Sequence, residues 1–205
     1  MTLLTDPSFL SAVTAAFVTG VFGPLVLQYF KLKFRKKSDP LHQELKLSNI
    51  INEKLLEVQE EIESDRIWIA QFHNGGHFYP TGKSIQKFSI IYEVDKPGIL
   101  SIQSNFQNIP VNLFSKSINY ILEEGTICIS DYKDKNISTY GLRYIANETG
   151  CKSGYLFAIH SLDGKFISML GVDFVRETKS LPEETINNIE NTASAIGSLL
   201  GELSK

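Results

Sequence analysis

Cysteine and tryptophan are scarce in this 205-residue sequence, which contains only Cys128, Cys151 and a single tryptophan, Trp68. Two cysteines do not make the disulfide framework of a small secreted domain, so they indicate a reducing compartment where thiols act as small hydrophobic side chains. Catalytic signatures are missing as well, because the chain has neither a G-x-S-x-G elbow nor a G-x-x-x-x-G-K-[ST] phosphate loop. We therefore predict a protein that is not an enzyme.

Clustered positive charge is confined to one short segment. Residues 31–37 contain five lysines and arginines and no acid, whereas the rest of the chain after them has an excess of acidic residues, and the whole carries a net charge of −3. Nucleic-acid backbones are bound by clustered lysine and arginine on the body of a domain. An acidic body therefore predicts that nucleic acid is not a partner.

The first 30 residues contain no lysine or arginine, and residues 7–30 contain no charged residue at all. A helix of this length reaches about 36 Å, enough to cross a hydrocarbon core of about 30 Å. A cleaved signal peptide is disfavoured because its positive amino-terminal region is missing. We predict a single transmembrane helix at 7–30, although a buried or interfacial helix is the alternative reading.

The basic segment fixes the predicted orientation of this span. Positive charge next to a membrane helix stays on the cytoplasmic side. We therefore predict a basic juxtamembrane linker at 31–40 and a cytoplasmic carboxyl-terminal part, held at the inner (plasma) membrane.

A helical connector is predicted at 41–64, because no glycine or proline occurs between residues 41 and 74. Apolar residues recur there at spacings close to a heptad seam, over about two repeats. This pattern favours a coiled coil and a homodimer, while packing of the helix on its own domain is the alternative. The seam residues are Leu47, Ile51, Leu55, Val58 and Ile62.

The remaining segment, 65–205, alternates short β-rich runs with helical patterns. Three helices are predicted at 111–124, at 140–148 and from Ser180 onward, where a capping box marks the start. Strands are predicted by runs of apolar and β-branched residues between turn signals. They cover residues 67–72, 87–93, 99–103, 126–130, 154–160 and 166–175.

This order of elements resembles the GAF domain of the GAF/PAS sensory superfamily. The resemblance is carried most clearly by the hairpin GYLFAIHSLDGKFISMLGVDFV and by the final helix, which begins SLPEETINNIENTASAIG. It implies an α+β fold: an antiparallel sheet of about six strands, terminal helices on one face and a ligand cavity on the other. It also implies a homodimer formed through the connector and the carboxyl-terminal helix.

Two ligand classes of the family lack support in this sequence. The Asn-Lys…Phe…Asp-Glu constellation of the cyclic-nucleotide subset is not found, and no cysteine stands where a bilin linkage would need it. We therefore predict no cofactor.

The stretch FHNGGHFYP, directly after the first predicted strand, is one candidate site. His73 and His77 are four residues apart, a spacing that suits a metal only on a helix, and the two glycines between them oppose a helix. No metal site is therefore predicted. The alternatives are an ordered loop, or a ligand-facing role for Phe72, His73, Asn74, His77 and Phe78.

The short helix at 140–148 is predicted to form the second wall of a pocket. Arg143 stands between two tyrosines at helical spacing and could hold a carboxylate or phosphate, although a surface arginine stacked on tyrosine is the alternative. The candidate residues in this wall and its neighbours are Tyr92, Asp131, Tyr140, Arg143 and Tyr144.

The sequence therefore predicts a membrane-anchored cytoplasmic sensory or regulatory module that binds a small ligand or a partner protein without catalysis. The first alternative is a membrane-tethered scaffold whose cavity is occluded and whose surface binds another protein. The second is a metal-assisted hydrolase that uses His73 and His77.

Overall fold

The computed structural model describes residues 22–33, 39–77 and 84–203, together with Ser11, Ala16 and Gly20. The chain divides into two units, Met1–Gln43 and Glu44–Lys205. Half of the predicted transmembrane segment, part of the basic linker at 34–38, and Phe78 lie outside the described residues.

The first unit contains the helix α2, Gly23–Lys33, in which Pro24 occupies the first turn, where its missing N–H costs no hydrogen bond. Among the helices that the structure describes, none combines the length and the apolar character needed to cross a membrane.

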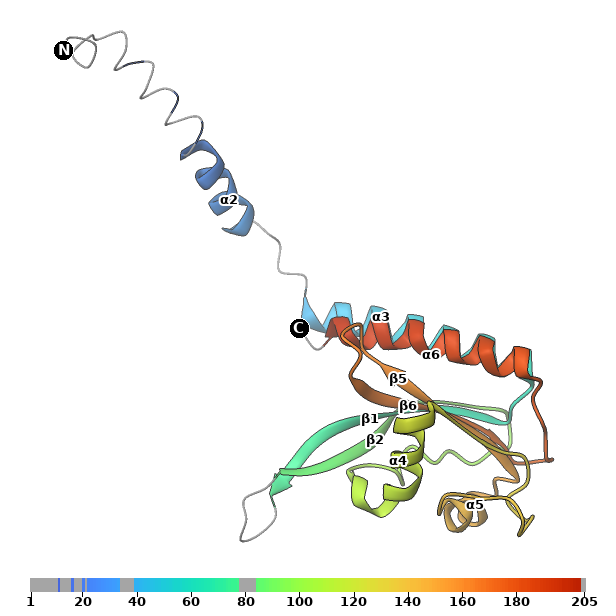
Figure 1. The fold of residues 1–205 in the computed structure, drawn as a ribbon. Coiled ribbons are helices and arrows are strands. Elements are labelled where there is room, and N and C mark those ends of the chain that lie inside the picture. The colour runs from blue at the N-terminus through green and yellow to red at the C-terminus, as the bar shows by residue number, and fades with distance from the viewer. Residues whose placement is uncertain are drawn as a thin grey trace. The chain divides into compact units, whose positions relative to one another are not determined.

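The second unit is built on one six-stranded antiparallel sheet, and the predicted α+β class is confirmed (Figure 1). The strand order is β3-β2-β1-β6-β5-β4, so the first strand lies beside the last at the centre. The strands are β1, Arg66–His77; β2, Ser84–Asp95; β3, Ile109–Pro110; β4, Thr126–Ile129; β5, Ser153–His160; and β6, Phe166–Phe174.

Helices cover both faces of this sheet. The long helices α3, Pro40–Ile62, and α6, Glu183–Leu203, lie side by side on one face, and the short helices α4, Ser115–Glu124, and α5, Arg143–Thr149, lie on the other (Figure 1). Side chains of a strand alternate between the two faces. Ile67 and Ile69 of β1 therefore join the core under α3 and α6, whereas Trp68 and Ala70 join the core under α4 and α5.

The apolar seam of the connector helix packs against its own domain. Ile51, Leu55, Val58 and Ile62 of α3 are buried against the sheet, together with a matching stripe of α6. This is the intramolecular packing that the sequence left open as the alternative to a coiled coil. The homodimer stays a prediction.

One predicted strand is wrong. Residues 99–103 belong to an irregular loop, 96–108, and the strand that follows β2 is the two-residue β3. The loop runs along the edge of β2 and is held there largely by side chains. The side-chain amide of Gln103 donates to the Ile91 carbonyl, and that of Gln107 donates to the Ile90 carbonyl.

The stretch after the first predicted strand is itself strand. β1 continues through Asn74, Gly75 and Gly76 to His77, paired with β2 except for an irregularity between Asn74 and His77. Gly76 has a positive φ of 72°, the conformation that glycine allows at this irregularity.

α6 approaches β5 closely at one glycine. A Cβ on Gly197 would lie 2.1 Å from the carbonyl oxygen of His160, a backbone atom that has no freedom to move aside. One turn later, a Cβ on Gly201 would meet its nearest neighbour, the Cβ of Ser161, at 3.7 Å, which is ordinary contact.

These two glycines give a matched test of the helix packing. We expect Gly197→Ala to lower the free energy of unfolding by about 2–3 kcal/mol, because the helix must lift from the sheet. Gly201→Ala should leave it unchanged or raise it by up to about 1 kcal/mol, because alanine favours helix. Urea unfolding of both variants measures the difference; equal effects would contradict this packing.

Candidate functional site

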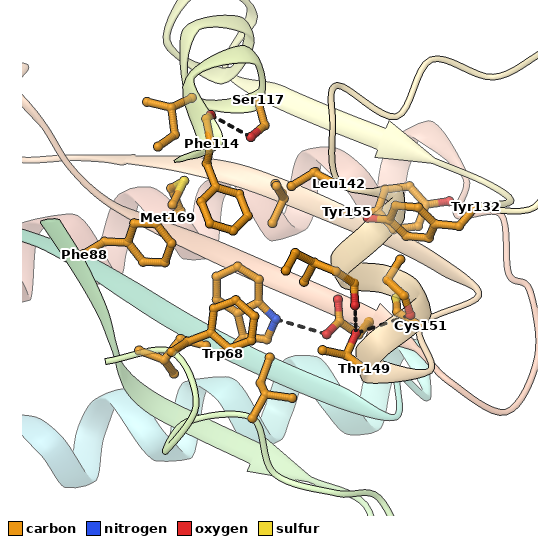
Figure 2. Close-up of a pocket in the computed structure, with 18 residues that line it drawn as sticks. Trp68, Phe88, Phe114, Ser117, Tyr132, Leu142, Thr149, Cys151, Tyr155 and Met169 are labelled. Carbon is orange, nitrogen blue, oxygen red and sulfur yellow. Dashed lines mark hydrogen bonds between the residues drawn. The ribbon is translucent and has the colours of Figure 1, made fainter. Parts of the chain in front are cut away.

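A cavity lies between the sheet and the short helices α4 and α5, and its volume is about 70 Å³ (Figure 2). Trp68 of β1 and Met169 of β6 lie on its sheet side, and Phe114 and Leu142 face them from the opposite layer. Its lining is mostly apolar. Asp173 is the only side chain among the 18 described lining residues that carries a charge.

The position of the Trp68 side chain depends on a glycine in the neighbouring strand. Trp68 pairs with Gly171 of β6, and a Cβ on that glycine would lie 2.1 Å from the indole ring. The indole therefore lies flat over the β6 backbone. Its Nε1–H donates a hydrogen bond of 3.1 Å to Oδ2 of Asp173, as the dashed line in Figure 2 shows.

Asp173 is paired with a fully buried arginine. Arg66 has 0% of its surface exposed, and its Nε–H donates to Oδ2 of Asp173 over 2.9 Å. Nη2 of Arg66 lies 2.7 Å from the same oxygen, a close ion pair, although it is not aligned as a hydrogen bond. Charges removed from water need such a partner, so the pair joins β1 to β6 beside the cavity.

Arg66 and Glu93 also hold the 96–108 loop. Nη1 of Arg66 donates to the Leu100 carbonyl over 3.0 Å. Oε1 of Glu93 accepts the Ile102 amide, and Oε2 accepts the Gln103 amide, each over 2.8 Å. The side chain of Glu93 is nearly fully buried, 3.9 Å from Nε of Arg66. The loop is thus held by charge-assisted hydrogen bonds, the stronger kind.

Negative charge is in excess around this arginine. Asp95 pairs with Arg66 across the β1–β2 ladder, and its Oδ1 is enclosed without a hydrogen-bond partner among the described residues. Burial, followed by the neighbouring Glu93 carboxylate, raises the pKa of Asp95 to about 6. One guanidinium therefore faces the carboxylates of Glu93, Asp95 and Asp173.

Two further titratable groups of the lining, Cys151 and Tyr132, are neutral. Burial is the main reason that the pKa of the Cys151 thiol is raised, and the nearby Asp173 carboxylate raises it further. Burial likewise raises the pKa of the Tyr132 phenol. Both groups therefore keep their protons at neutral pH.

A groove of about 440 Å³ lies directly outside the cavity. Leu100, Leu113 and Tyr144 line the groove and are 80%, 69% and 68% exposed. The groove and the cavity share five lining residues, which we call the cavity wall. These residues, Ile102, Phe106, Phe114, Ile145 and Thr149, are all that the two spaces share. Side chains, not sheet backbone, therefore separate the groove from the cavity.

The described candidate residues of FHNGGHFYP do not line this cavity. Phe72 packs edge-on against Phe166, with ring centroids 4.8 Å apart. His73 points to the other face of the sheet, and its Nε2 forms a 2.9 Å hydrogen bond with the hydroxyl of Ser89. Asn74 is exposed in the strand, His77 ends it, and Phe78 lies outside the described residues.

The candidates of the predicted second wall are scattered. Tyr92 hydrogen-bonds Ser48 on the α3 side of the sheet, and Asp131 accepts the Lys133 amide in an exposed turn. Tyr140 stacks on Tyr120, with ring centroids 4.0 Å apart.

Arg143 and Tyr144, at the start of α5, have different surroundings. Nη2 of Arg143 donates to the Asp134 carbonyl over 2.7 Å, so this guanidinium holds the loop before α5. Tyr144 alone of the candidates lines the groove. α5 does line the cavity, but through Ile145, Ala146 and Thr149 and not through Arg143.

No group of three His, Cys, Asp or Glu side chains among the described residues is placed to hold a metal ion. The described part of the chain adds no support to the metal-assisted hydrolase. The Nε2 atom of His73 is already hydrogen-bonded to the hydroxyl of Ser89.

Comparisons of the sequence with known proteins give no match, either to protein-family profiles or to curated proteins. Comparison of the structure with solved structures gives several matches. The PixJ GAF domain of Thermosynechococcus elongatus, in its blue-light absorbing form, matches with a TM-score of 0.62 and 14% identity, over 80% of this chain and 90% of that chain. The fold is that of a GAF domain.

Two further structures agree. GAF3 from Synechocystis sp. PCC6803, in its photoproduct state, matches with a TM-score of 0.60 and 13% identity over 77% of this chain and 95% of its own. The phycocyanobilin-bound GAF domain from a cyanobacterial phytochrome matches with a TM-score of 0.59 and 16% identity, over 88% of this chain and 94% of its own. These identities are low, so the likeness shows the GAF fold alone.

Proposed function

We propose that the GAF-fold unit is a non-catalytic regulatory module whose cavity binds a small ligand. The observation that carries this proposal is the cavity wall: an apolar space with one buried charge is separated from an exposed apolar groove by side chains alone. Binding sites are concave, mostly apolar and supplied with a few placed polar groups, as this one is.

The size of the cavity restricts the ligand. A volume of about 70 Å³ is far below the roughly 300–1,000 Å³ of sites for drug-sized molecules. A bilin of the kind bound in the phycocyanobilin-bound neighbour is much larger than this space. We therefore propose a ligand whose inner end is small, with any larger part passing the wall into the groove.

The 96–108 loop gives ligand binding a route to the rest of the unit. The loop contributes Ile102 and Phe106 to the cavity wall, and Arg66 and Glu93 tie it to β1 and β2. On the other face of β1, Ile67 and Ile69 pack in the core that also holds α3. Displacement of the cavity wall would therefore change the packing of α3 on β1. α3 is the helix that leads back towards the amino terminus.

We propose further that residues 7–30 hold this module at the inner (plasma) membrane, with the GAF-fold unit cytoplasmic. Support comes from the uncharged run and from the five cations that follow it. A homodimer through α3 and α6 belongs to the same proposal. Its support is the exposure of Leu45 and Leu56 on α3, away from the buried seam.

A membrane-tethered scaffold is the second candidate. The small size of the cavity favours it, because the exposed apolar groove then serves a partner protein while the cavity stays dry.

A thermal-shift screen of metabolites with a cavity-filling variant separates the two candidates. Ala146 is buried on α5 and lines the cavity, so Ala146→Leu fills it with three additional carbon atoms. We expect a ligand to raise the melting temperature of the unaltered protein by mass action, and to have no effect on Ala146→Leu.

The control makes the same exchange at Ala195, an exposed residue of α6, and should respond to the ligand like the unaltered protein. Ligands that stabilise Ala146→Leu as strongly as the unaltered chain would place binding elsewhere and contradict the cavity site.

Flotation with liposomes tests the anchor. We expect the full-length chain to float with the lipid after an alkaline wash. Val13→Asp combined with Val18→Asp should move it towards the soluble fraction, because each aspartate in a membrane helix costs about 2.5–3.5 kcal/mol. Leucine at the same two positions is the control. An unaltered chain that stays in the supernatant without detergent would contradict the anchor.

A further inference from the structure

The charge in the cavity lining indicates the sign of the ligand. Asp173 is the charged lining residue, and its partner Arg66, which does not line the cavity, also faces Glu93. With Asp95 included, three carboxylates surround one guanidinium, and Asp95 is already driven to a raised pKa by burial and by Glu93. A second cation would be stabilised at this position, and an anion would be repelled.

Four of the hydrogen-bond donors in the lining point to the same conclusion. The hydroxyls of Ser117 and Thr149 donate to the carbonyls of Phe114 and Ile145, and the Cys151 thiol donates to the Ser153 carbonyl. The indole of Trp68 donates to Asp173. These four donors are therefore already engaged and do not offer an anion a binding site. Nε of Arg66 and Nε1 of Trp68 both donate to Oδ2 of Asp173, and Nη2 of Arg66 lies beside the same oxygen, so none of these three groups engages Oδ1.

Aromatic rings make up much of the remaining lining. Trp68, Phe88, Phe106 and Phe114 all line the cavity, and Figure 2 shows the indole and the Phe114 ring above the sheet. The faces of aromatic rings attract organic cations, most strongly where water is excluded. A carboxylate at one end and aromatic rings around it together fit an organic ammonium group.

We propose that the ligand of this cavity is a small organic amine in its ammonium form, with its nitrogen at Asp173 and its alkyl chain directed to the cavity wall. This inference rests on the proposed function and adds the chemical class of the ligand. An engineered cavity of about 150 Å³ holds one benzene, so about 70 Å³ accommodates an ammonium head with one or two carbons. A longer chain passes between Phe106 and Phe114 into the groove.

Trp68 supplies a direct reporter, because it is the only tryptophan in the chain and its indole N–H bonds Asp173. The test titrates the full-length, nitrogen-15-labelled protein in mild detergent with three probes of matched shape: butylammonium, 1-butanol and butyrate. The readout is the indole N–H resonance. We expect butylammonium to shift it saturably and to bind at least about tenfold more tightly than 1-butanol, a difference of about 1.4 kcal/mol. Butyrate should not shift it.

Two variants locate the effect. Ala146→Leu should abolish the butylammonium shift, which excludes binding to acidic groups on the surface. Asp173→Asn should remove the preference for butylammonium over 1-butanol. The comparison of probes on the unaltered protein decides the question even if Asp173→Asn does not fold, because it needs no substitution.

The outcomes distinguish this inference from the proposed function. If 1-butanol or butyrate binds as tightly as butylammonium, the amine class is wrong while the ligand cavity stands. If no probe shifts the indole, the amine class is also wrong. The ligand cavity is then judged by the metabolite screen with Ala146→Leu, which does not depend on amines.

Discussion

The buried ion pair between Arg66 and Asp173 is the interaction on which the rest of the structure depends. It joins the first strand of the sheet to the last, residues that are more than 100 positions apart in sequence. Arg66 is fully enclosed, so its charge has no access to water and depends on this carboxylate. The same arginine reaches the Leu100 carbonyl and so fixes the loop that closes the cavity.

This arrangement connects stability with binding. Oδ2 of Asp173 stabilises the fold, because it accepts hydrogen bonds from Arg66 and Trp68. The same side chain also lines the cavity. Glu93 holds the 96–108 loop, and that loop provides two of the five cavity-wall residues. A ligand that displaced the wall would therefore act on the network that fixes β1, and through β1 on the core beneath α3.

The sequence predicted the fold more closely than the site, and the reasons are physical. Strand and helix periods are local, so the alternation of Ile67, Trp68 and Ile69 and the stripe of α6 identify their elements without any partner. Residues 99–103 look like a strand, but they are held by Glu93 and Arg66 from the side, and a propensity pattern does not contain that contact.

The site depends on contacts between distant segments. The polar residues of FHNGGHFYP stand out by composition, yet His73 turns to Ser89 on the opposite face of the sheet. In the sequence, Asp173 is a single acid within a strand, the kind that is more often structural than catalytic, until β6 is placed beside β1. The only signal available in the sequence was that two core strands contain charged residues of opposite sign. Arg66 stands at the start of β1, and Asp173 stands near the end of β6.

A double-mutant cycle on Arg66 and Asp173 tests the central claim most directly, with the free energy of unfolding measured by urea and helical circular dichroism. The account predicts that Arg66→Met and Asp173→Leu each lower it by about 3–5 kcal/mol, because each leaves a buried charge unpaired. The double variant should lose at least about 2 kcal/mol less than the sum of the two losses. Losses that simply add would show that the two residues do not depend on each other, and would contradict the account.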